Sequence, residues 1–434
     1  MKRQPEPKLI PQELPNQPVI LYEGFAELCN QNQIVEGNGF VKLTWHPYPR
    51  ISFKFVYSGH DRIDLDNQRN IELKLTELVP QYRLKVYHYL TQWSGATNNT
   101  EITGFVAEPL IKGYTDELAS VVFYITNFPC FDISNSEDED EDYNDWLFFN
   151  LSNSNRFTFK NNNWRITLGN LDYNYEFQQI LEAEGGYGIT HICKIDKLDN
   201  SSFSLEEVYP QIEAFCYYLS FARGLWIAPI LVSGFNVQGD QVFEEWRTPL
   251  IKADSWEKSY VWPDILFSTE IVQTFSGFME KWEDNNWQEV IKNSIQWYIE
   301  SLKVATFPNT SIILIQAALE KIAWTFLNST NCISPSGFLK LTFDDKIRLT
   351  LKYLGIEEID LSECSNLEKI AKERNWLNSI NAMNEIRNLI VHPKINKSNN
   401  NIEISEKIMI ETHNLAFSYL LKCLLKIFNY HFLE

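Results

Sequence analysis

The sequence predicts an α+β protein of several domains, with a β-rich N-terminal domain, a mixed α/β middle domain and an all-α C-terminal helical bundle. Three observations carry this prediction. Short segments of alternating apolar and polar residues, separated by turn-forming residues, fill the first third of the chain. Strand-like and helix-like patterns are interspersed in the middle, and helical periodicity dominates from residue 288 onward. The predicted segments are a flexible leader at 1–18, a β-rich, sandwich-like domain at 19–163, a mixed domain at 164–287 and a helical domain at 288–434.

The leader and the β-rich domain differ sharply in pattern. Residues 1–18 contain five prolines and few apolar side chains, which predicts a loose N-terminal segment. Phe40–Trp45 and Ile51–Phe55 alternate apolar and polar residues on either side of a turn with two prolines. Further strands are predicted at Ile71–Leu75, Arg83–Tyr89, Ile102–Glu108, Ala119–Thr126 and Arg156–Lys160.

Six adjacent carboxylates, Glu137–Asp142, interrupt the β-rich domain. Charges of one sign at this density repel one another and cannot be buried, so an exposed loop is predicted. A calcium site is the alternative, but the spaced ligands and the glycine of a recognised calcium loop are missing.

The mixed domain is predicted to contain a strand at Trp164–Leu168, a short helix at Phe177–Glu184 and a long helix at Leu205–Ala222. The glycines of Gly185–His191 could cradle a phosphate. They precede a strand-like segment, however, whereas a dinucleotide fingerprint follows a strand and opens a helix. A tight turn or a bulge is therefore the favoured interpretation.

The C-terminal domain is predicted to be entirely helical. Five segments show helical periodicity and are joined by short polar or proline-containing links, which describes a bundle. The predicted helices lie near 289–305, 309–328, 343–354, 365–392 and 403–431.

Composition narrows the class of protein. The 434 residues are 44% hydrophobic, so bulk disorder is excluded. The sequence predicts no apolar run of membrane-spanning length, and the N-terminus lacks the apolar block of a secretory signal. Seven scattered cysteines without a CxxC pair predict reduced thiols and a cytoplasmic location. The whole net charge of −19 lies before residue 288, because residues 288–434 hold 16 basic and 16 acidic side chains.

Arg387, Asn388 and His392 stand close together at the predicted end of the fourth C-terminal helix. On a helical wheel Arg387 falls on the apolar stripe, where a guanidinium needs a carboxylate partner or an open cleft. Glu320, in another mostly apolar helix, is the best candidate partner. One interpretation is an Arg–Glu pair that orders the bundle, with His392 complementing the helix dipole. The other is that Asn388 and His392, one turn apart, act on one ligand.

The segment Arg387–His392 resembles the Arg-x4–6-His signature of the HEPN superfamily, including the Asn that often follows the Arg. The resemblance covers about Gln288–Glu434 and implies a HEPN helical bundle that dimerises across a shared cleft. It implies a metal-independent endoribonuclease, in which His392 acts as general acid or base and Arg387 stabilises the charged phosphate. Asn388 would orient the phosphate or His392, and Glu320 would orient Arg387. No cofactor is implied.

The implied partners are RNA, a second copy of the chain and a phage-derived protein or nucleic acid that triggers the nuclease. HEPN proteins of this kind act in bacterial anti-phage defence by abortive infection, and the β-rich domain before a HEPN domain resembles the layout of ApeA-type defence proteins. Three segments of the middle region, Gly185–His191, Leu219–Gly224 and Gly234–Gly239, resemble the YopA-like central domain. That resemblance implies no mechanism.

No second catalytic constellation competes with this motif. The other histidines show no metal-ligand spacing, and no GxSxG, Walker A or kinase motif is present. The rival hypothesis is a non-catalytic binding or dimerisation protein, in which the aromatic-rich β domain binds protein or glycan. Nucleotidyl transfer is a third alternative, which the lack of a recognisable metal-binding carboxylate pair disfavours.

Overall fold

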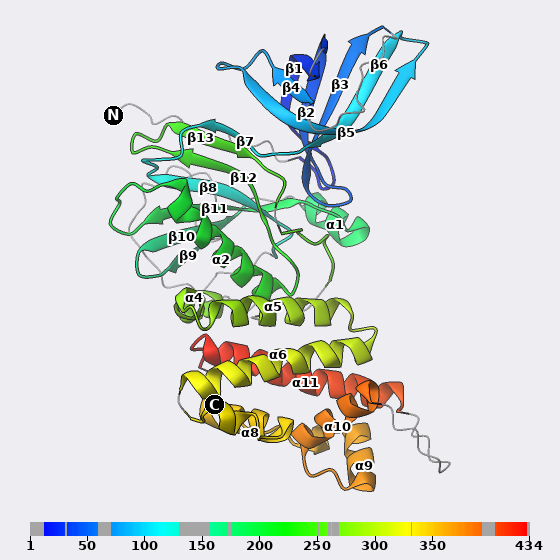
Figure 1. Cartoon of the computed structure of the whole chain (residues 1–434), viewed down its shortest axis with the longest axis vertical. Helices are drawn as coiled ribbons and strands as arrows, with labels where there is room; N and C mark the ends of the chain where they lie inside the picture. The colour runs from blue at the N-terminus through cyan, green and yellow to red at the C-terminus, as the bar shows by residue number, and fades with distance from the viewer. Residues whose placement is uncertain are drawn as a thin grey trace. The chain divides into compact units, whose positions relative to one another are not determined.

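The computed structural model describes residues 13–30, 33–59, 71–129, 156–171, 175–249, 251–258, 262, 269–330, 332–392 and 404–431. The chain forms two compact units (Figure 1). Unit 1 comprises Met1–Leu219 and Trp226–Lys258, and unit 2 comprises Ser220–Leu225 and Ser259–Glu434. The strands lie in unit 1 and most of the helical residues in unit 2, so the predicted α+β class is confirmed. The acidic run Glu137–Asp142 lies outside the described residues.

The first six strands close into an antiparallel barrel in the order β1-β2-β3-β6-β5-β4. Alternate residues point inward: Phe53, Phe55 and Tyr57 of β3 are buried, whereas their neighbours are partly exposed. This alternation is the signal that predicted the strands. The barrel consists of β1 (Val19–Asn30), β2 (Gln33–Thr44), β3 (Arg50–Ser58), β4 (Glu72–Leu75), β5 (Tyr82–Ser94) and β6 (Asn99–Val106).

A seven-stranded antiparallel sheet follows, in the order β7-β13-β12-β8-β11-β10-β9. Helix α1 (Tyr175–Glu184) precedes β11, and α2 (Leu205–Arg223) packs on the sheet through Phe215, whose ring centroid lies 5.0 Å from that of Phe159. The strands are β7 (Leu110–Gly113), β8 (Ser120–Thr126), β9 (Arg156–Lys160), β10 (Trp164–Asn170), β11 (Ile189–Lys197), β12 (Pro229–Phe235) and β13 (Gln241–Trp246).

The strand pairing differs from the predicted grouping of 19–163 and 164–287. Strand β7 pairs with β13, β8 pairs with β11 and β12, and β9 pairs with β10. The second sheet therefore takes strands from both predicted domains. The sandwich-like domain is replaced by a barrel and a separate sheet. Alternation within a strand reports which face is buried, but it does not report which sheet the strand joins.

The Gly185–Gly188 segment connects α1 to β11, and its backbone groups bind other parts of unit 1. The amide of Tyr187 donates to Asn16 Oδ1 at 2.8 Å, and that of Gly188 donates to Asn127 Oδ1 at 3.0 Å. Gly185 and Gly186 have φ of 68° and 86°, which glycine adopts at little cost. Because the amides of Tyr187 and Gly188 already have protein acceptors, the segment has a structural role and these amides are not open to a phosphate.

The same contacts correct the prediction of a flexible leader for residues 13–18. Asn16 Nδ2 also donates to the carbonyl of Gly185 at 3.1 Å, and Trp45 Nε1 donates to the carbonyl of Gln17. Polar contacts over a large sequence separation, which proline content cannot reveal, hold this segment on unit 1. The rest of the predicted leader lies outside the described residues.

Unit 2 is helical, as predicted, with one break in a predicted helix. The predicted helix 365–392 is two helices, α9 and α10, because Asn375 adopts a left-handed conformation with φ 58° and ends α9. Asn378 then caps α10. The helices are α3 (Thr269–Gln273), α4 (Phe275–Glu283), α5 (Gln288–Lys303), α6 (Pro308–Ser329), α7 (Pro335–Phe338), α8 (Phe343–Leu354), α9 (Ser365–Arg374), α10 (Ser379–Val391) and α11 (Glu406–Ile427).

Helix α6 is the central helix of unit 2, in contact with α5, α8, α10 and α11. Ile312, Ile315, Leu319 and Ile322 follow helical spacing and are almost fully buried. Within the described residues, α6 alone is long and apolar enough to cross a membrane, contrary to the expectation from the sequence. The core helix of a folded domain has the same composition, and the packing of α6 accounts for it here.

We predict that replacing Asn16 with glycine destabilises unit 1. The change removes two hydrogen bonds and leaves the amide of Tyr187 without its acceptor, while glycine keeps the positive φ of 67° at this position. The expected loss in the free energy of unfolding is about 1–3 kcal/mol in urea denaturation. Gln17→Ala, which changes an exposed neighbouring side chain, is the control. Equal stability of the two variants would contradict the docked segment.

We also predict acid destabilisation through His191 of β11. Its ring is fully buried, and burial lowers its pKa to about 3. Because the unfolded chain binds a proton at this ring below about pH 6.5 and the folded chain does not, stability falls as the pH decreases from about 6.5 toward 3. His191→Gln is expected to lessen the pH dependence of the free energy of unfolding by up to about 1.4 kcal/mol per pH unit. Parallel curves for the two chains would contradict the prediction.

Candidate functional site

Helix α10 is held in place by polar contacts to three neighbouring helices. Gln316 Nε2 of α6 donates to the carbonyl of Met383 at 2.9 Å, and Asn381 Nδ2 donates to Asp344 Oδ2 of α8 at 2.7 Å. At the N-terminus of α10, Ser379 Oγ lies 2.8 Å from the hydroxyl of Tyr419 of α11. Ile380, Met383 and other apolar residues of α10 are buried beneath these contacts. Because these contacts hold the first two turns of α10, they also set the position of its C-terminal end.

Arg387 and Asn388 lie near the C-terminal end of α10, and His392 is the C-cap residue that follows it. Arg387 Nη1 donates to Asn388 Oδ1 at 3.3 Å, and the amide of His392 donates to the carbonyl of Asn388 at 2.8 Å. Arg387 and Asn388 are half-buried, and His392 is exposed at the C-terminal cap. The guanidinium makes no ion pair with any carboxylate in the described part of the chain. The C-terminal end of α10 therefore presents a cation, an amide and, at the cap, an imidazole.

The structure gives Glu320 a different partner from the one expected. Its carboxylate lies 2.6 Å from Lys346 Nζ of α8, and Lys346 Nζ lies 4.6 Å from the centroid of the Phe338 ring. The prediction that Glu320 pairs with Arg387 is thus replaced by a bridge between α6 and α8. The helical wheel identified two side chains in need of a partner, but it did not show that α8 packs beside α6 at this level.

Two histidines outside the motif are buried rather than exposed. His413 of α11 lies against Phe417, and burial lowers its pKa. Its Nδ1 lies 3.1 Å from Asn414 Oδ1, and the ring of His191 makes a similar contact with Thr190. No group of three or more His, Cys, Asp or Glu side chains among the described residues could hold a metal ion.

Sequence reasoning did not identify the residues that place α10. Gln316, Asp344 and Asn381 act as helix-to-helix contacts, although each stands among ordinary helical positions. The available signal was polarity on an otherwise apolar face: Gln316 sits between Ile315 and Ala317 in α6, where burial requires a hydrogen-bond partner.

Two protein-family models match the two later parts of the chain. Residues 113–259 match the YopA central domain, and residues 284–432 match the YopA C-terminal domain. Both segments match the YopA family. The chain is also 24% identical over 388 residues to the "SPbeta prophage-derived uncharacterized protein YopA" of Bacillus subtilis (strain 168). The aligned residues cover 87% of this chain and 83% of that protein. No solved structure matches the chain.

The YopA matches follow the architecture closely. The central-domain match begins at the end of β7 and spans the rest of the second sheet, and the C-terminal match spans α5 to α11. The predicted YopA-like central domain is confirmed, and the family likeness extends to the helical domain. Neither match is to a HEPN family, so the HEPN resemblance stays a prediction.

We predict that Glu320 is energetically coupled to Lys346 and not to Arg387. In a double-mutant cycle of the free energy of unfolding, Glu320→Gln with Lys346→Met is expected to show a coupling of about 0.5–1 kcal/mol, as for a partly exposed ion pair. Glu320→Gln with Arg387→Met is expected to be additive to within about 0.5 kcal/mol. A larger coupling to Arg387 would restore the pairing expected from the sequence.

Proposed function

We propose that unit 2 is a metal-independent endoribonuclease whose reacting groups are Arg387 and His392. The observation that supports this most is the state of Arg387, a half-buried guanidinium whose hydrogen bond is to an amide and which no described carboxylate neutralises. A cation kept in this state at the end of a helix is suited to bind an anion, because its charge is not already balanced.

The chemistry follows from the roles of the three side chains. The 2′-hydroxyl of the RNA attacks the adjacent phosphorus as His392 accepts its proton, and the bond from phosphorus to the 5′-oxygen breaks. The leaving 5′-oxygen takes a proton from an imidazolium, which the second subunit of a homodimer supplies. Arg387 stabilises the negative charge on the phosphoryl oxygens, and Asn388 holds the guanidinium in place. Glu320 has a structural role in this scheme, because its carboxylate is bound to Lys346.

The biological setting we propose is anti-phage defence by abortive infection. The Bacillus subtilis relative is described as prophage-derived, which supports a role in the contest between phages and their hosts. Unit 1 then senses a phage-derived protein or nucleic acid and restrains the nuclease until that trigger is bound. The acidic character of residues 1–287 suits regulation better than general binding of RNA.

We predict RNA cleavage, in the presence of a chelator, by the full-length chain purified from phage-infected cells, where the infection supplies the trigger. Arg387→Ala and His392→Ala are each expected to reduce the rate at least about 100-fold, since each removes a group that acts in the transition state. Arg348→Ala and His431→Ala are matched controls, because they remove an Arg and a His from exposed positions of unit 2 outside the motif. Unchanged cleavage by His392→Ala, or equal loss in the controls, would refute the proposed nuclease.

The second candidate is a binding or dimerisation protein without catalysis. The observation that favours it is the Glu320–Lys346 ion pair, through which one of the four predicted site residues connects α6 to α8. Expression in bacteria discriminates the two functions when phage infection supplies the trigger. Growth arrest that requires His392 supports the nuclease, and arrest or protection that is the same with His392→Ala supports the binding protein.

A further inference from the structure

Three cations that pair with no described carboxylate lie at one end of the outer surface of the barrel. In the β2–β3 pair, Lys42 is opposite Ser52 and Thr44 is opposite Arg50, so Lys42 and Arg50 point outward as diagonal neighbours. Lys252 Nζ lies 4.4 Å from the centroid of the Tyr48 ring, and Arg50 Cζ lies 6.0 Å from the same centroid. Tyr48 thus has two cations against its ring.

The lack of ion pairs at these cations is unusual within the barrel. Lys54, Lys74, Arg83 and Lys85 each lie within 3.3 Å of a glutamate oxygen. Lys42, Arg50 and Lys252, in contrast, make no ion pair with any described carboxylate. Arg50 Nε is also buried and has no hydrogen-bond partner among the described residues. In a chain of net charge −19, the described carboxylates leave these three cations at this end of the barrel without an ion pair.

Aromatic rings are interleaved with the cations. The guanidinium of Arg50 lies 5.7 Å from the centroid of Phe105 and 5.9 Å from that of Tyr89, and the rings of Phe105 and Tyr87 are 5.4 Å apart. Tyr87 and Tyr89 remain 39% and 55% exposed. Their rings are therefore already partly ordered by neighbours and still offer area to a ligand.

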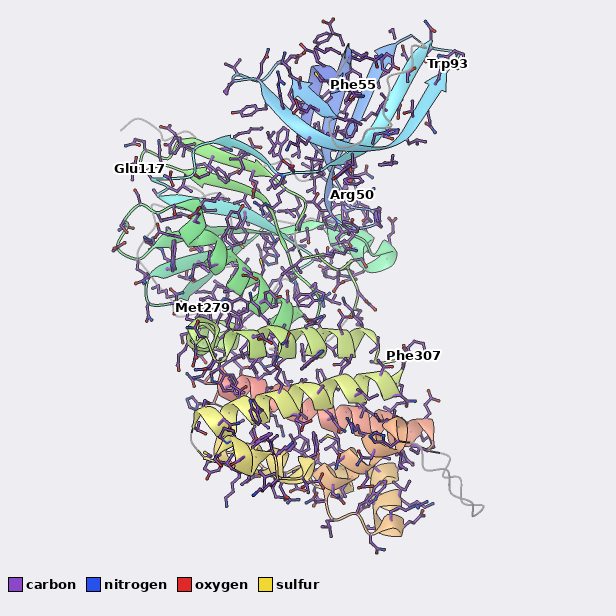
Figure 2. The ribbon with its side chains drawn as sticks, in the orientation of Figure 1. Arg50, Phe55, Trp93, Glu117, Met279 and Phe307 are labelled. Carbon is purple, nitrogen blue, oxygen red and sulfur yellow. The ribbon has the colours of Figure 1, made fainter. Side chains whose placement is uncertain are left out.

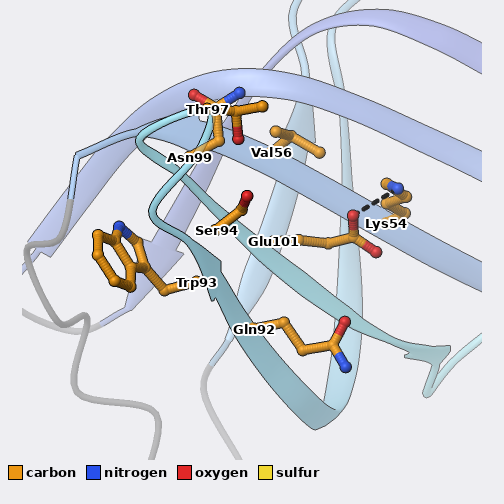
Figure 3. A pocket seen from close by; sticks show the side chains of 8 residues that line it. All are labelled: Lys54, Val56, Gln92, Trp93, Ser94, Thr97, Asn99 and Glu101. Atoms are coloured by element: carbon orange, nitrogen blue, oxygen red, sulfur yellow. Dashed lines mark ion pairs between the residues drawn. The ribbon is translucent and has the colours of Figure 1, made fainter.

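The same outer surface continues along β3, β6 and β5 into a hollow of about 500 Å³ (Figure 3). Val56, Glu101 and Gln92 lie side by side across these strands, and Trp93 lies at one edge of the hollow with half of its surface exposed. Arg50 and Trp93 are at opposite ends of the barrel (Figure 2). From Arg50 to Ser58, β3 spans about 26 Å at about 3.3 Å per residue. The hollow is lined by Lys54, Val56, Gln92, Trp93, Ser94, Thr97, Asn99 and Glu101.

We propose that this outer surface of β3, β5 and β6 binds single-stranded RNA. Proteins bind a single strand by combining cations that follow its phosphates with aromatic side chains on which its bases stack. Arg50, Lys42 and Lys252 serve as the phosphate-binding cations, and Tyr87 and Tyr89 serve as the stacking rings. The amides and hydroxyls of the hollow contact the bases or the 2′-hydroxyls farther along the strand. An RNA duplex conceals its base faces, and a peptide of acidic residues alone has no ring to stack, so neither uses this combination fully.

The negative charge of the whole chain limits this site to a few phosphates. At physiological salt, charges farther than about 8 Å from a phosphate are largely screened, so the three local cations dominate its binding. Each phosphate contact with a single strand contributes about −0.7 to the slope of log K against log salt. We therefore expect a slope near −2, which is much shallower than the slope of a broadly basic protein. This inference goes beyond RNA cleavage, because binding at unit 1 does not require the Arg387–His392 motif.

The test measures binding of a fluorescein-labelled twelve-nucleotide oligouridylate to the full-length chain by fluorescence anisotropy with a chelator present. The His392→Ala chain serves as the background, so that cleavage does not consume the probe. Tyr89→Ala is expected to weaken binding about 5- to 100-fold at constant salt. Arg50→Gln and Lys252→Gln are each expected to weaken binding and to reduce the salt slope by about 0.7.

Two variants of unit 1 are matched controls. Arg83→Gln removes the same charge from an exposed, ion-paired site of the barrel, and Tyr114→Ala removes a 47% exposed ring that follows β7. Both are expected to bind like the background chain, and all variants are expected to keep its thermal unfolding temperature to within a few degrees. No binding of the oligouridylate at low salt, equal losses in the controls, or equal affinity for an oligoglutamate peptide would each overturn the proposal. Binding by a wild-type chain that does not cleave RNA even after phage infection has supplied the trigger would refute the nuclease and leave this inference standing.

Discussion

The burial of α6 is the constraint on which the architecture of unit 2 depends. Its apolar residues meet four other helices, and each must present an apolar stripe to it. Two polar side chains of α6 bind neighbouring helices: Gln316 donates to the backbone of α10, and Glu320 binds Lys346 of α8. These two contacts set where α8 and α10 cross α6, and so they set where the Arg387–His392 turn lies.

The proposed chemistry depends on this placement in a simple way. The first two turns of α10 are buried or hydrogen-bonded to other helices, whereas its C-terminal end carries a cation that pairs with no described carboxylate and, at the cap, an exposed imidazole. A positioned reacting group requires a rigid support that ends in an accessible polar surface. The barrel of unit 1 also presents polar and aromatic side chains from a regular scaffold, because its strands hold Arg50 and Tyr89 at an accessible surface.

Local patterns were the most predictable part of this molecule, and long-range contacts the least. The limits of β9 and α8 follow from alternation and helical periodicity, because those signals report burial of one face. The assignment of β8 to the second sheet, the docking of Asn16 on Gly185 and the pairing of Glu320 with Lys346 depend on residues far apart in the chain. The break at Asn375 had a local signal, since Asn tolerates a left-handed conformation, but the apolar periodicity on both sides concealed it.

The chemistry of the cleaved ends tests the central claim most directly. RNA carrying one 2′-deoxynucleotide at a cleaved position is incubated with the trigger-activated chain and a chelator, and the products are examined by mass spectrometry. The account predicts 2′,3′-cyclic phosphate ends at every normal position and no cleavage at the deoxynucleotide, because the attacking hydroxyl is missing there. Cleavage at the deoxynucleotide, or products ending in a 3′-hydroxyl and a 5′-phosphate, would contradict attack by the 2′-hydroxyl and with it the role assigned to His392.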